Sequence, residues 1–176
     1  MGETLRATFR RALHLPNRRA AVRGGRLERV EFARGVTVYL PAGYDDRDRR
    51  YPVLYMQDGQ NLFDPERAFV RGQHWRLKEA ADDAIHARTM EPVIMVAVDN
   101  AGDKRVDEYT PARDPQKDAG GGAANYGRML VEELKPLIDS RYRTEPRAAT
   151  GGSSLGGLVS LYLALKHPGI AADALD

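Results

Sequence analysis

Apolar segments of strand length alternate with helical segments along this chain, and this alternation limits the possible folds more than any other feature. Residues 53–56 (VLYM) and 92–98 (PVIMVAV) are continuous apolar runs, typical of strands that are buried on both faces. Between them, residues 75–87 have apolar side chains at helical spacing. Strands that alternate with helices predict βαβ units, and therefore a mostly parallel sheet with helices on both faces. The expected fold class is α/β.

Further elements extend this pattern toward both ends of the chain. Pro136 is expected to kink the second helix, because proline removes one backbone hydrogen bond. Three connections each follow a strand, so we expect them to meet at one edge of the sheet, where ligand sites of such sheets lie. The expected strands are 27–32, 36–40, 53–56, 92–98 and 148–150, the helices are 75–87, 126–139 and 155–166, and the connections are 58–74, 99–124 and 151–156.

Length and composition narrow the class of protein. The chain has 176 residues, of which 42% are hydrophobic and 30% charged, as in a globular domain. It contains no cysteine, which excludes disulfides and thiol-based metal or redox sites. The longest apolar run, around residues 93–98, is far shorter than the roughly 20 residues of a membrane-spanning helix. The N-terminus lacks the apolar region of a secretory signal, so we expect a cytoplasmic protein without a membrane partner.

The positive charge is concentrated at the N-terminus. Residues 1–30 carry eight arginines against Glu3 and Glu28, whereas the rest of the chain is net acidic. A basic arm can bind phosphate backbones, but only Phe9 is available there to stack on bases, so we expect no nucleic-acid partner. We interpret residues 1–25 as a basic lead-in and residues 26–176 as the folded domain.

Gly152-Ser153-Ser154-Leu155-Gly156 matches the G-x-S-x-G pattern, with a short strand before it and an apolar helix directly after it. This setting is typical of a nucleophile elbow, in which glycines let the strand and helix pass closely and the serine adopts a strained backbone conformation. Ser154 is therefore the candidate nucleophile, and the backbone N–H of Leu155 is a candidate oxyanion donor. The alternative is a glycine-rich helix start at which Ser154 is only a capping side chain.

A second oxyanion donor is expected from the loop after the strand 53–56. This loop begins Asp58-Gly59-Gln60, and Gly59 permits close approach of the backbone, so the N–H of Gln60 is our candidate. An ordinary Asp-Gly turn is the alternative interpretation.

Five stretches of the chain together resemble the putative-esterase family of α/β-hydrolases, which includes esterase D-like, enterochelin esterase-like and feruloyl esterase-like enzymes and the mycolyltransferases. The resemblance covers about residues 36–168. It implies a three-layer α/β-hydrolase-type fold and a serine esterase without metal or organic cofactor. It further implies Ser154 as nucleophile and Leu155 and Gln60 as oxyanion donors. Residues 105–109 also match the family, and we interpret them as a structural loop near the site, braced by its own charge pairs, with a catalytic role as the alternative. The stretches are VYLPAGY (38–44), YPVLYMQDGQNLFD (51–64), VDNAGDKRVDEYTP (98–111), LVEELKPLIDSRYR (130–143) and GGSSLGGLVSLYLALKHP (151–168).

A triad base and acid are missing from this pattern. Such hydrolases have the order Ser…Asp/Glu…His, but only 22 residues follow Ser154. Among these, His167 would lie roughly 20 Å away at the far end of the helix, so we expect it to be a C-terminal cation of that helix. His14 lies in the basic arm, and His86 is expected at the surface. His74 is expected at a helix start or at a substrate contact, with a substitute base as the alternative.

The family pattern also departs after Pro168, because residues 169–176 (GIAADALD) are a poor strand. We interpret the domain as incomplete, lacking the C-terminal strands, with a bare outer edge at the strand 148–150. A bare edge favours pairing with another chain, so the expected partners are a second copy or a complementing C-terminal fragment, besides a small-molecule ester. Two functions remain open: a serine esterase completed from outside this chain, and a truncated, non-catalytic hydrolase-like interaction module.

Overall fold

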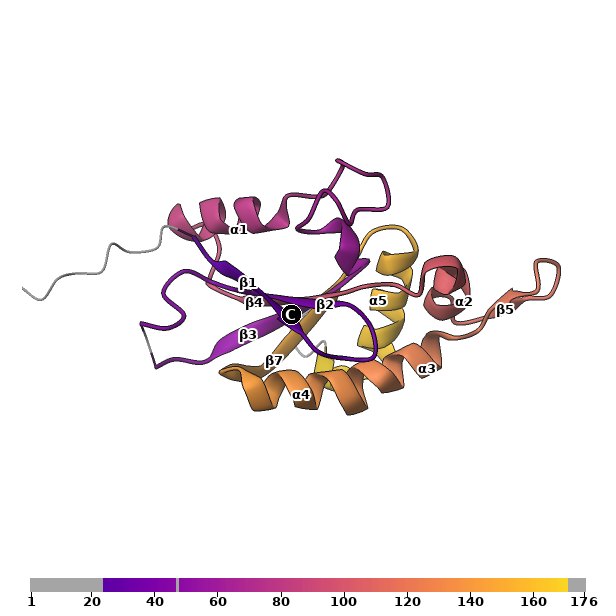
Figure 1. Ribbon diagram of the computed structural model, residues 1–176. Coiled ribbons are helices and arrows are strands. Elements are labelled where there is room, and N and C mark those ends of the chain that lie inside the picture. The colour runs from indigo at the N-terminus through magenta and orange to yellow at the C-terminus, as the bar shows by residue number, and fades with distance from the viewer. Residues whose placement is uncertain (1–23, 47, 171–176) are drawn as a thin grey trace, which may run out of the picture.

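The computed structural model describes residues 24–46 and 48–170, and a five-stranded sheet forms its centre (Figure 1). β2 pairs antiparallel with β1 and β4, whereas β3 pairs in parallel with β4 and β7. Four of the five strands therefore run in the same direction, and the predicted mostly parallel sheet is confirmed. In spatial order the strands are β1 (Arg26–Val30), β2 (Val36–Leu40), β4 (Ile94–Val98), β3 (Tyr51–Gln57) and β7 (Thr144–Gly151).

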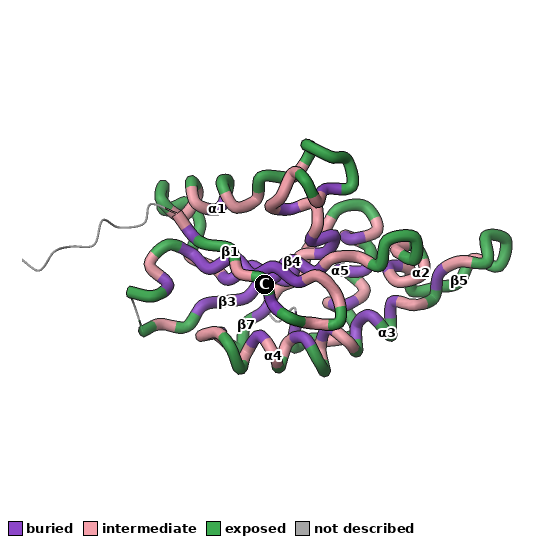
Figure 2. The backbone as a smooth tube through the Cα atoms, viewed as in Figure 1, coloured by how far each residue is buried: buried purple, intermediate pink, exposed green. Residues whose placement is uncertain are grey.

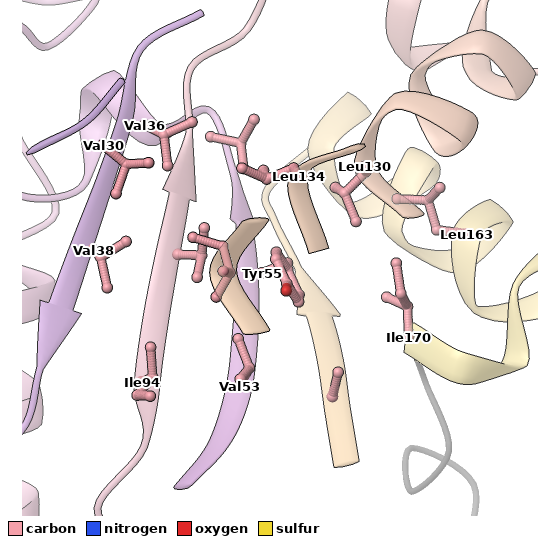
Figure 3. Packing of buried hydrophobic residues seen from close by; sticks show 14 of the residues in the cluster. Val30, Val36, Val38, Val53, Tyr55, Ile94, Leu130, Leu134, Leu163 and Ile170 are labelled. Carbon is pink, nitrogen blue, oxygen red and sulfur yellow. The ribbon is translucent and has the colours of Figure 1, made fainter. Parts of the chain in front are cut away.

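One face of the sheet carries the larger core. Alternate side chains of the strands, such as Val38, Tyr55 and Ile94, point to this face and are fully buried (Figure 3). They pack against the apolar sides of the helices that cover this face, which is why residues at helical spacing contact residues at strand spacing. These helices are α3 (Ala123–Arg128), a π-helical segment (Met129–Leu134), α4 (Lys135–Arg141) and α5 (Leu155–Lys166).

A smaller core lies on the opposite face, under α1 (Leu77–His86). Tyr39 and Met95 from the sheet pack there against Ala81 of α1. The two cores make three layers with helices on both faces, as the fold prediction requires. Figure 2 shows the result: the backbone is buried through the sheet and mostly exposed along the outer side of α1.

The helix predicted for residues 126–139 is longer and less regular than expected. Helical backbone runs from Ala123 to Arg141, with π-helical turns over Met129–Leu134 directly before Pro136 in the first turn of α4. Proline cannot donate to the carbonyl four residues earlier and clashes with it, so the wider turn accommodates the ring. The effect of Pro136 that the structure shows is therefore this π segment, and the kink stays a prediction.

The predicted loops contain short elements that the sequence did not indicate. Residues 58–74 include the 3₁₀ turn η1 (Gly59–Asn61). Residues 99–124 include further short elements, and 3₁₀ turn η4 follows α5. These elements are η2 (Gly102–Lys104), α2 (Arg105–Tyr109), the strands β5 (Arg113–Asp114) and β6 (Ala119–Gly120), and η4 (Pro168–Ile170).

The carboxyl ends of β3, β4 and β7 meet at one edge of the sheet, because these neighbouring strands are parallel. The connections that follow them gather at this edge, as predicted. β7 is the last strand on its side among the residues that the structure describes. The basic lead-in, His14 included, lies almost wholly outside the described residues.

None of the helices in the described part of the chain is long and apolar enough to cross a membrane.

Candidate active site

Ser154 lies at the sharp turn that joins β7 to α5. Its backbone has φ 55° and ψ −121°, a positive-φ conformation that residues with a side chain rarely adopt. Ser154 makes no side-chain capping hydrogen bond at the start of α5, and the residue is exposed. The local conformation is thus the strained one expected of an elbow, and the capping alternative has no hydrogen bond to support it.

The glycines beside Ser154 are required by close backbone contacts. A Cβ atom on Gly152 would lie 2.7 Å from the backbone carbon of Gly156, and a Cβ on Gly156 would lie 2.9 Å from Oδ2 of Asp58. Neither distance is available to a real side chain. The strand and helix therefore pass at a separation that only glycine permits, as predicted from the motif.

The start of α5 places free donors beside Ser154. The turn is closed by the N–H of Gly156, which donates to the Ser153 carbonyl at 2.8 Å, and by that of Leu158, which donates to the Ser154 carbonyl at 3.0 Å. None of the hydrogen bonds found among residues 24–46 and 48–170 uses the N–H of Leu155 as donor. This N–H at a helix N-terminus can stabilise negative charge that develops on a bound group.

Gln60 lies in η1, directly after β3. The turn is held by the N–H of Asn61, which donates to the Asp58 carbonyl at 2.9 Å, and the Gln60 side chain accepts from the N–H of Asn100 at 3.3 Å. Within the described ranges, no hydrogen bond takes the backbone N–H of Gln60 as donor either. Because Asp58 contacts the elbow at Gly156, η1 begins beside the first turn of α5.

Asp58 is a site residue that the sequence reasoning did not single out. Its side chain is only 2% exposed, and its carboxylate accepts two hydrogen bonds from Arg105, Nε to Oδ1 at 2.7 Å and Nη2 to Oδ2 at 2.8 Å. Asn100 donates to the same Oδ1 at 2.7 Å. The sequence signal was a carboxylate directly after a buried strand, with an arginine in the next connection at the same sheet edge.

The expectation for residues 105–109 is wrong in two respects. The segment is the helix α2, and its charged side chains pair outward, not with one another. Glu108 accepts from Arg34 at 2.5 Å, and Asp107 accepts the N–H of Gly120 at 2.7 Å. Charges at helical spacing face different neighbours, so adjacency in sequence gave the wrong pairs. A structural role for the segment remains the interpretation.

A buried polar chain lies beneath the elbow. Tyr126 donates to Oε1 of Gln57, whose Nε2 donates to Thr150 at 2.9 Å. Thr150 donates to Ser160 at 3.3 Å, and Ser160 donates to the Gly156 carbonyl at 2.7 Å. Burial raises the pKa of Tyr126 well above its ordinary value, so this hydroxyl stays a donor. The chain links the end of β3 to the first turns of α5.

The described histidines lie elsewhere. His167 is the C-cap of α5, as expected, and its Nε2 would be 2.8 Å from a Cβ on Gly127 of α3. His86 ends α1 and is exposed, also as expected. His74 is partly buried just before α1. In the described part of the chain, no hydrogen bond joins a histidine side chain to Ser154.

A cavity of about 360 Å³ lies on the other side of η1, between β1, β2 and residues 63–67. Its lining includes Gly59, Arg29 and Arg67 but no residue of the elbow, so we do not assign the nucleophile to it. No group of three or more histidine, aspartate or glutamate side chains within residues 24–46 and 48–170 is placed to hold a metal ion.

The family model described as "Putative esterase" matches residues 28–173. Among curated proteins, the uncharacterized protein YbbA of Bacillus subtilis (strain 168) is 28% identical over 155 residues, which cover 84% of this chain and 57% of YbbA. The ferri-bacillibactin esterase BesA of the same organism is 27% identical over 137 residues, covering 67% of this chain and 44% of BesA. The chain thus spans about half the length of these relatives.

Solved structures share the same architecture. An IroE-like serine hydrolase from Shewanella oneidensis superposes with a TM-score of 0.59 at 26% identity, covering 80% of this chain and 46% of that one. The enterobactin hydrolase IroE, solved in complex with DFP, gives a TM-score of 0.62 at 21% identity, with coverages of 84% and 61%. The second likeness shows the fold alone.

Proposed function

Because the chain belongs to the putative esterase family, we propose that it supplies the nucleophile and the oxyanion donors of a carboxylic ester hydrolase. The proposal rests mainly on the position of Ser154. This residue is exposed, has a positive φ, and lies between a strand and a helix that pack so closely that only glycine fits at their contact. A residue held in such a conformation is typical of a nucleophile elbow.

The reaction follows from these positions. The Oγ of Ser154 attacks the ester carbonyl carbon, and its proton passes to a general base. The carbonyl oxygen becomes negative and accepts hydrogen bonds from the N–H groups of Leu155 and Gln60. The carbon–oxygen bond to the alcohol then breaks, and the alcohol leaves with the proton from the base. Water then attacks the acyl-serine and gives a proton to the base. The acid is released, and the Ser154 oxygen takes that proton back from the base.

We place the general base and its acid outside residues 24–170, since no histidine described there contacts Ser154. We propose that a second polypeptide, either another copy or a complementing C-terminal fragment, pairs with the edge of β7 at residues 148–150 and supplies them. This chain would then supply the nucleophile, and its partner would supply the groups that transfer the proton. The described residues support this proposal through the edge position of β7.

The non-catalytic interaction module is the second candidate, favoured by the same missing histidine contact. An ester assay separates the two functions. p-Nitrophenyl butyrate is offered to the chain and to its Ser154→Ala variant, with and without imidazole as an external base. Imidazole also hydrolyses p-nitrophenyl esters by itself, so its rate without protein is subtracted. The esterase proposal then expects imidazole to accelerate the wild-type chain and not the variant. Equal rates for the wild-type chain and the Ser154→Ala variant, with and without imidazole, would favour the non-catalytic interaction module.

The relatives suggest a second substrate for this assay. BesA is named for ferri-bacillibactin, so a ferric siderophore ester is the natural comparison with the small nitrophenyl ester. Release of acid from that substrate, dependent on Ser154, would extend the proposal from small esters to siderophore esters.

A further inference from the structure

Asp58 is held on one side by a rigid ion pair. Two parallel hydrogen bonds join its carboxylate to Arg105, at 2.7 and 2.8 Å, and Asn100 adds a third at 2.7 Å. A guanidinium that donates through two nitrogens fixes both the distance and the plane of a carboxylate. With its side chain 2% exposed, Asp58 depends on this partner to remain buried as an anion.

On its other side, Asp58 contacts the two parts of the candidate oxyanion site. Its Oδ2 lies against Gly156, where an added Cβ would be 2.9 Å away, so it packs on the first turn of α5. Its carbonyl accepts the N–H of Asn61 at 2.9 Å, which closes the turn that carries Gln60. Asp58 itself has φ 57° and ψ 44°, a left-handed conformation that needs support from its surroundings.

The helix α2 provides that support at two points. Arg105 begins α2 and holds the carboxylate of Asp58, while Tyr109 at its end accepts the backbone N–H of Asp58 at 3.2 Å. The guanidinium of Arg105 also lies over the ring of Tyr109, 5.3 Å from its centroid. The hydrogen bonds to Asp58 raise the pKa of Arg105, so its guanidinium stays charged.

We propose that Arg105 and Asp58 are positioning residues that set the N–H of Gln60 at its place beside Ser154. This inference rests on the proposed function. Neither side chain touches the reacting atoms: Arg105 fixes Asp58, Asp58 fixes the turn, and the turn presents the donor. An oxyanion donor acts only when it is held at the position that the developing charge will take, so small displacements cost rate.

Glu108 offers a matched control on the same helix. It forms the other ion pair of α2, with Arg34 at 2.5 Å, and both partners are partly buried. Arg34 lies between β1 and β2 and also donates to the Asp99 carbonyl at 3.2 Å, but none of its hydrogen bonds in the described ranges goes to Asp58 or η1. Glu108→Gln leaves the contacts of Arg105 and Asp58 in place, so it controls for a general loosening of α2.

Hydrogen exchange of the peptide 57–62, followed by mass spectrometry, tests the proposal in Arg105→Lys, Arg105→Met and Glu108→Gln. The N–H groups of Asn61 and Leu62 are bonded within the turn and report its order. We expect both Arg105 variants to exchange about tenfold faster there, and Glu108→Gln to exchange as the wild type does. Lysine keeps the charge but not the two-nitrogen geometry, so rescue by Arg105→Lys would overturn the proposal.

The imidazole-supported ester assay gives the second measurement. Both Arg105 variants should lower kcat by about tenfold to a hundredfold with KM within about twofold of wild type, because an acyl group still binds but its charge is stabilised less. An equal loss in Glu108→Gln would contradict a positioning role. So would faster exchange spread over β3 and β4 as well, which would mean general destabilisation.

Hydrogen exchange and the ester assay distinguish a failure of the positioning role from a failure of the proposed function. Exchange reports the turn whether or not esters are hydrolysed. A wild-type chain that equals Ser154→Ala in the ester assay would count against the proposed function. Unchanged exchange at residues 57–62 in the Arg105 variants would overturn the present inference, whatever the ester assay gives.

Discussion

Ser154 concentrates backbone strain at the one residue that is proposed to react. A non-glycine residue at such a positive φ costs on the order of 1–3 kcal/mol, which the surrounding packing must offset. The offset comes from close packing, since a Cβ added to Gly152 or Gly156 would lie less than 3.0 Å from backbone or side-chain atoms. The elbow is therefore held by this close packing together with the two backbone hydrogen bonds that close its turn.

Gly156→Ala tests this dependence on close packing. Its Cβ would be placed 2.9 Å from Oδ2 of Asp58 and 3.2 Å from Cβ of Gln57, so we expect a loss of about 1–3 kcal/mol in the free energy of unfolding. Urea denaturation measures the loss. Gly157→Ala is the control, because its Cβ would meet only the Gly152 carbonyl group, 3.3 Å away at the oxygen, and should stay within about 1 kcal/mol of wild type. Equal losses in both variants would refute the packing argument.

The motif was sufficient to predict the residues of the elbow but not those that support it. Ser154 and the neighbouring glycines can be recognised from a local sequence pattern of strand, turn and helix. Asp58 and Arg105 are 47 positions apart and meet only because β3 and β4 are parallel neighbours. A single sequence does not show which distant residues are in contact, so the ion pair between Asp58 and Arg105 could not be predicted. For the same reason, the prediction of ion pairs within residues 105–109 was wrong.

At the scale of elements, one carboxylate of α1 adds hydrogen bonds to the apolar packing between α1 and the sheet. Asp82 accepts the N–H of Gly25 at 2.6 Å, the hydroxyl of Tyr39 at 2.8 Å and the ammonium of Lys78 at 2.6 Å. Burial alone would raise the pKa of Asp82, but the three hydrogen bonds outweigh it, and the pKa is lowered. The carboxylate form is thus favoured by the fold.

Asp82→Asn should destabilise the protein in a pH-dependent way. The pKa is lower in the folded state than in the unfolded chain, so the contribution of Asp82 is complete above the unfolded value of about 4 and is lost as the pH falls through the folded value. We expect the variant to lose about 1–3 kcal/mol at pH 7 and the gap to narrow below pH about 4. Thermal melts from pH 7 down to pH 3 measure this, and a gap that stays constant over the series would contradict it.

Strand and helix boundaries show what periodicity can predict. Residues 36–40 and 155–166 were predicted with the observed bounds, because mostly apolar runs that end before Pro41 or begin at a glycine elbow leave little choice. β7 begins four residues earlier than predicted. Its Glu-Pro-Arg segment does not read as a strand, and the irregular pairing between Tyr51 and Val53 accommodates it. The start of β7 is therefore determined by its pairing with β3 and not by the strand preference of its own residues.

For the whole molecule, the edge position of β7 is the feature with consequences for assembly. β7 is the last strand of the sheet on its side among the described residues. Exposed strand edges pair readily with other chains. Glu145, Pro146 and Arg147 oppose such pairing at the start of β7, whereas the small residues at its end leave the edge near Ser154 open.

We therefore expect the chain to associate in solution. Light scattering during gel filtration should give at least twice the mass of one chain, 19.6 kDa, and the mass should fall on dilution. Association through β7 would bring a second copy to the side of the sheet that carries the elbow. A monodisperse species of 19.6 kDa at all concentrations would contradict the expectation.

The central claim is that residue 154 is a nucleophile aimed at an oxyanion site. A thiol reacts with esters without a strong general base, and the chain contains no other cysteine, so Ser154→Cys measures this claim without the missing base. Its burst of nitrophenolate from p-nitrophenyl butyrate is compared with that of Ser153→Cys, the exposed neighbour outside the elbow position. Our account predicts acylation at position 154 about a hundredfold faster than at position 153. Equal rates at the two positions would contradict it.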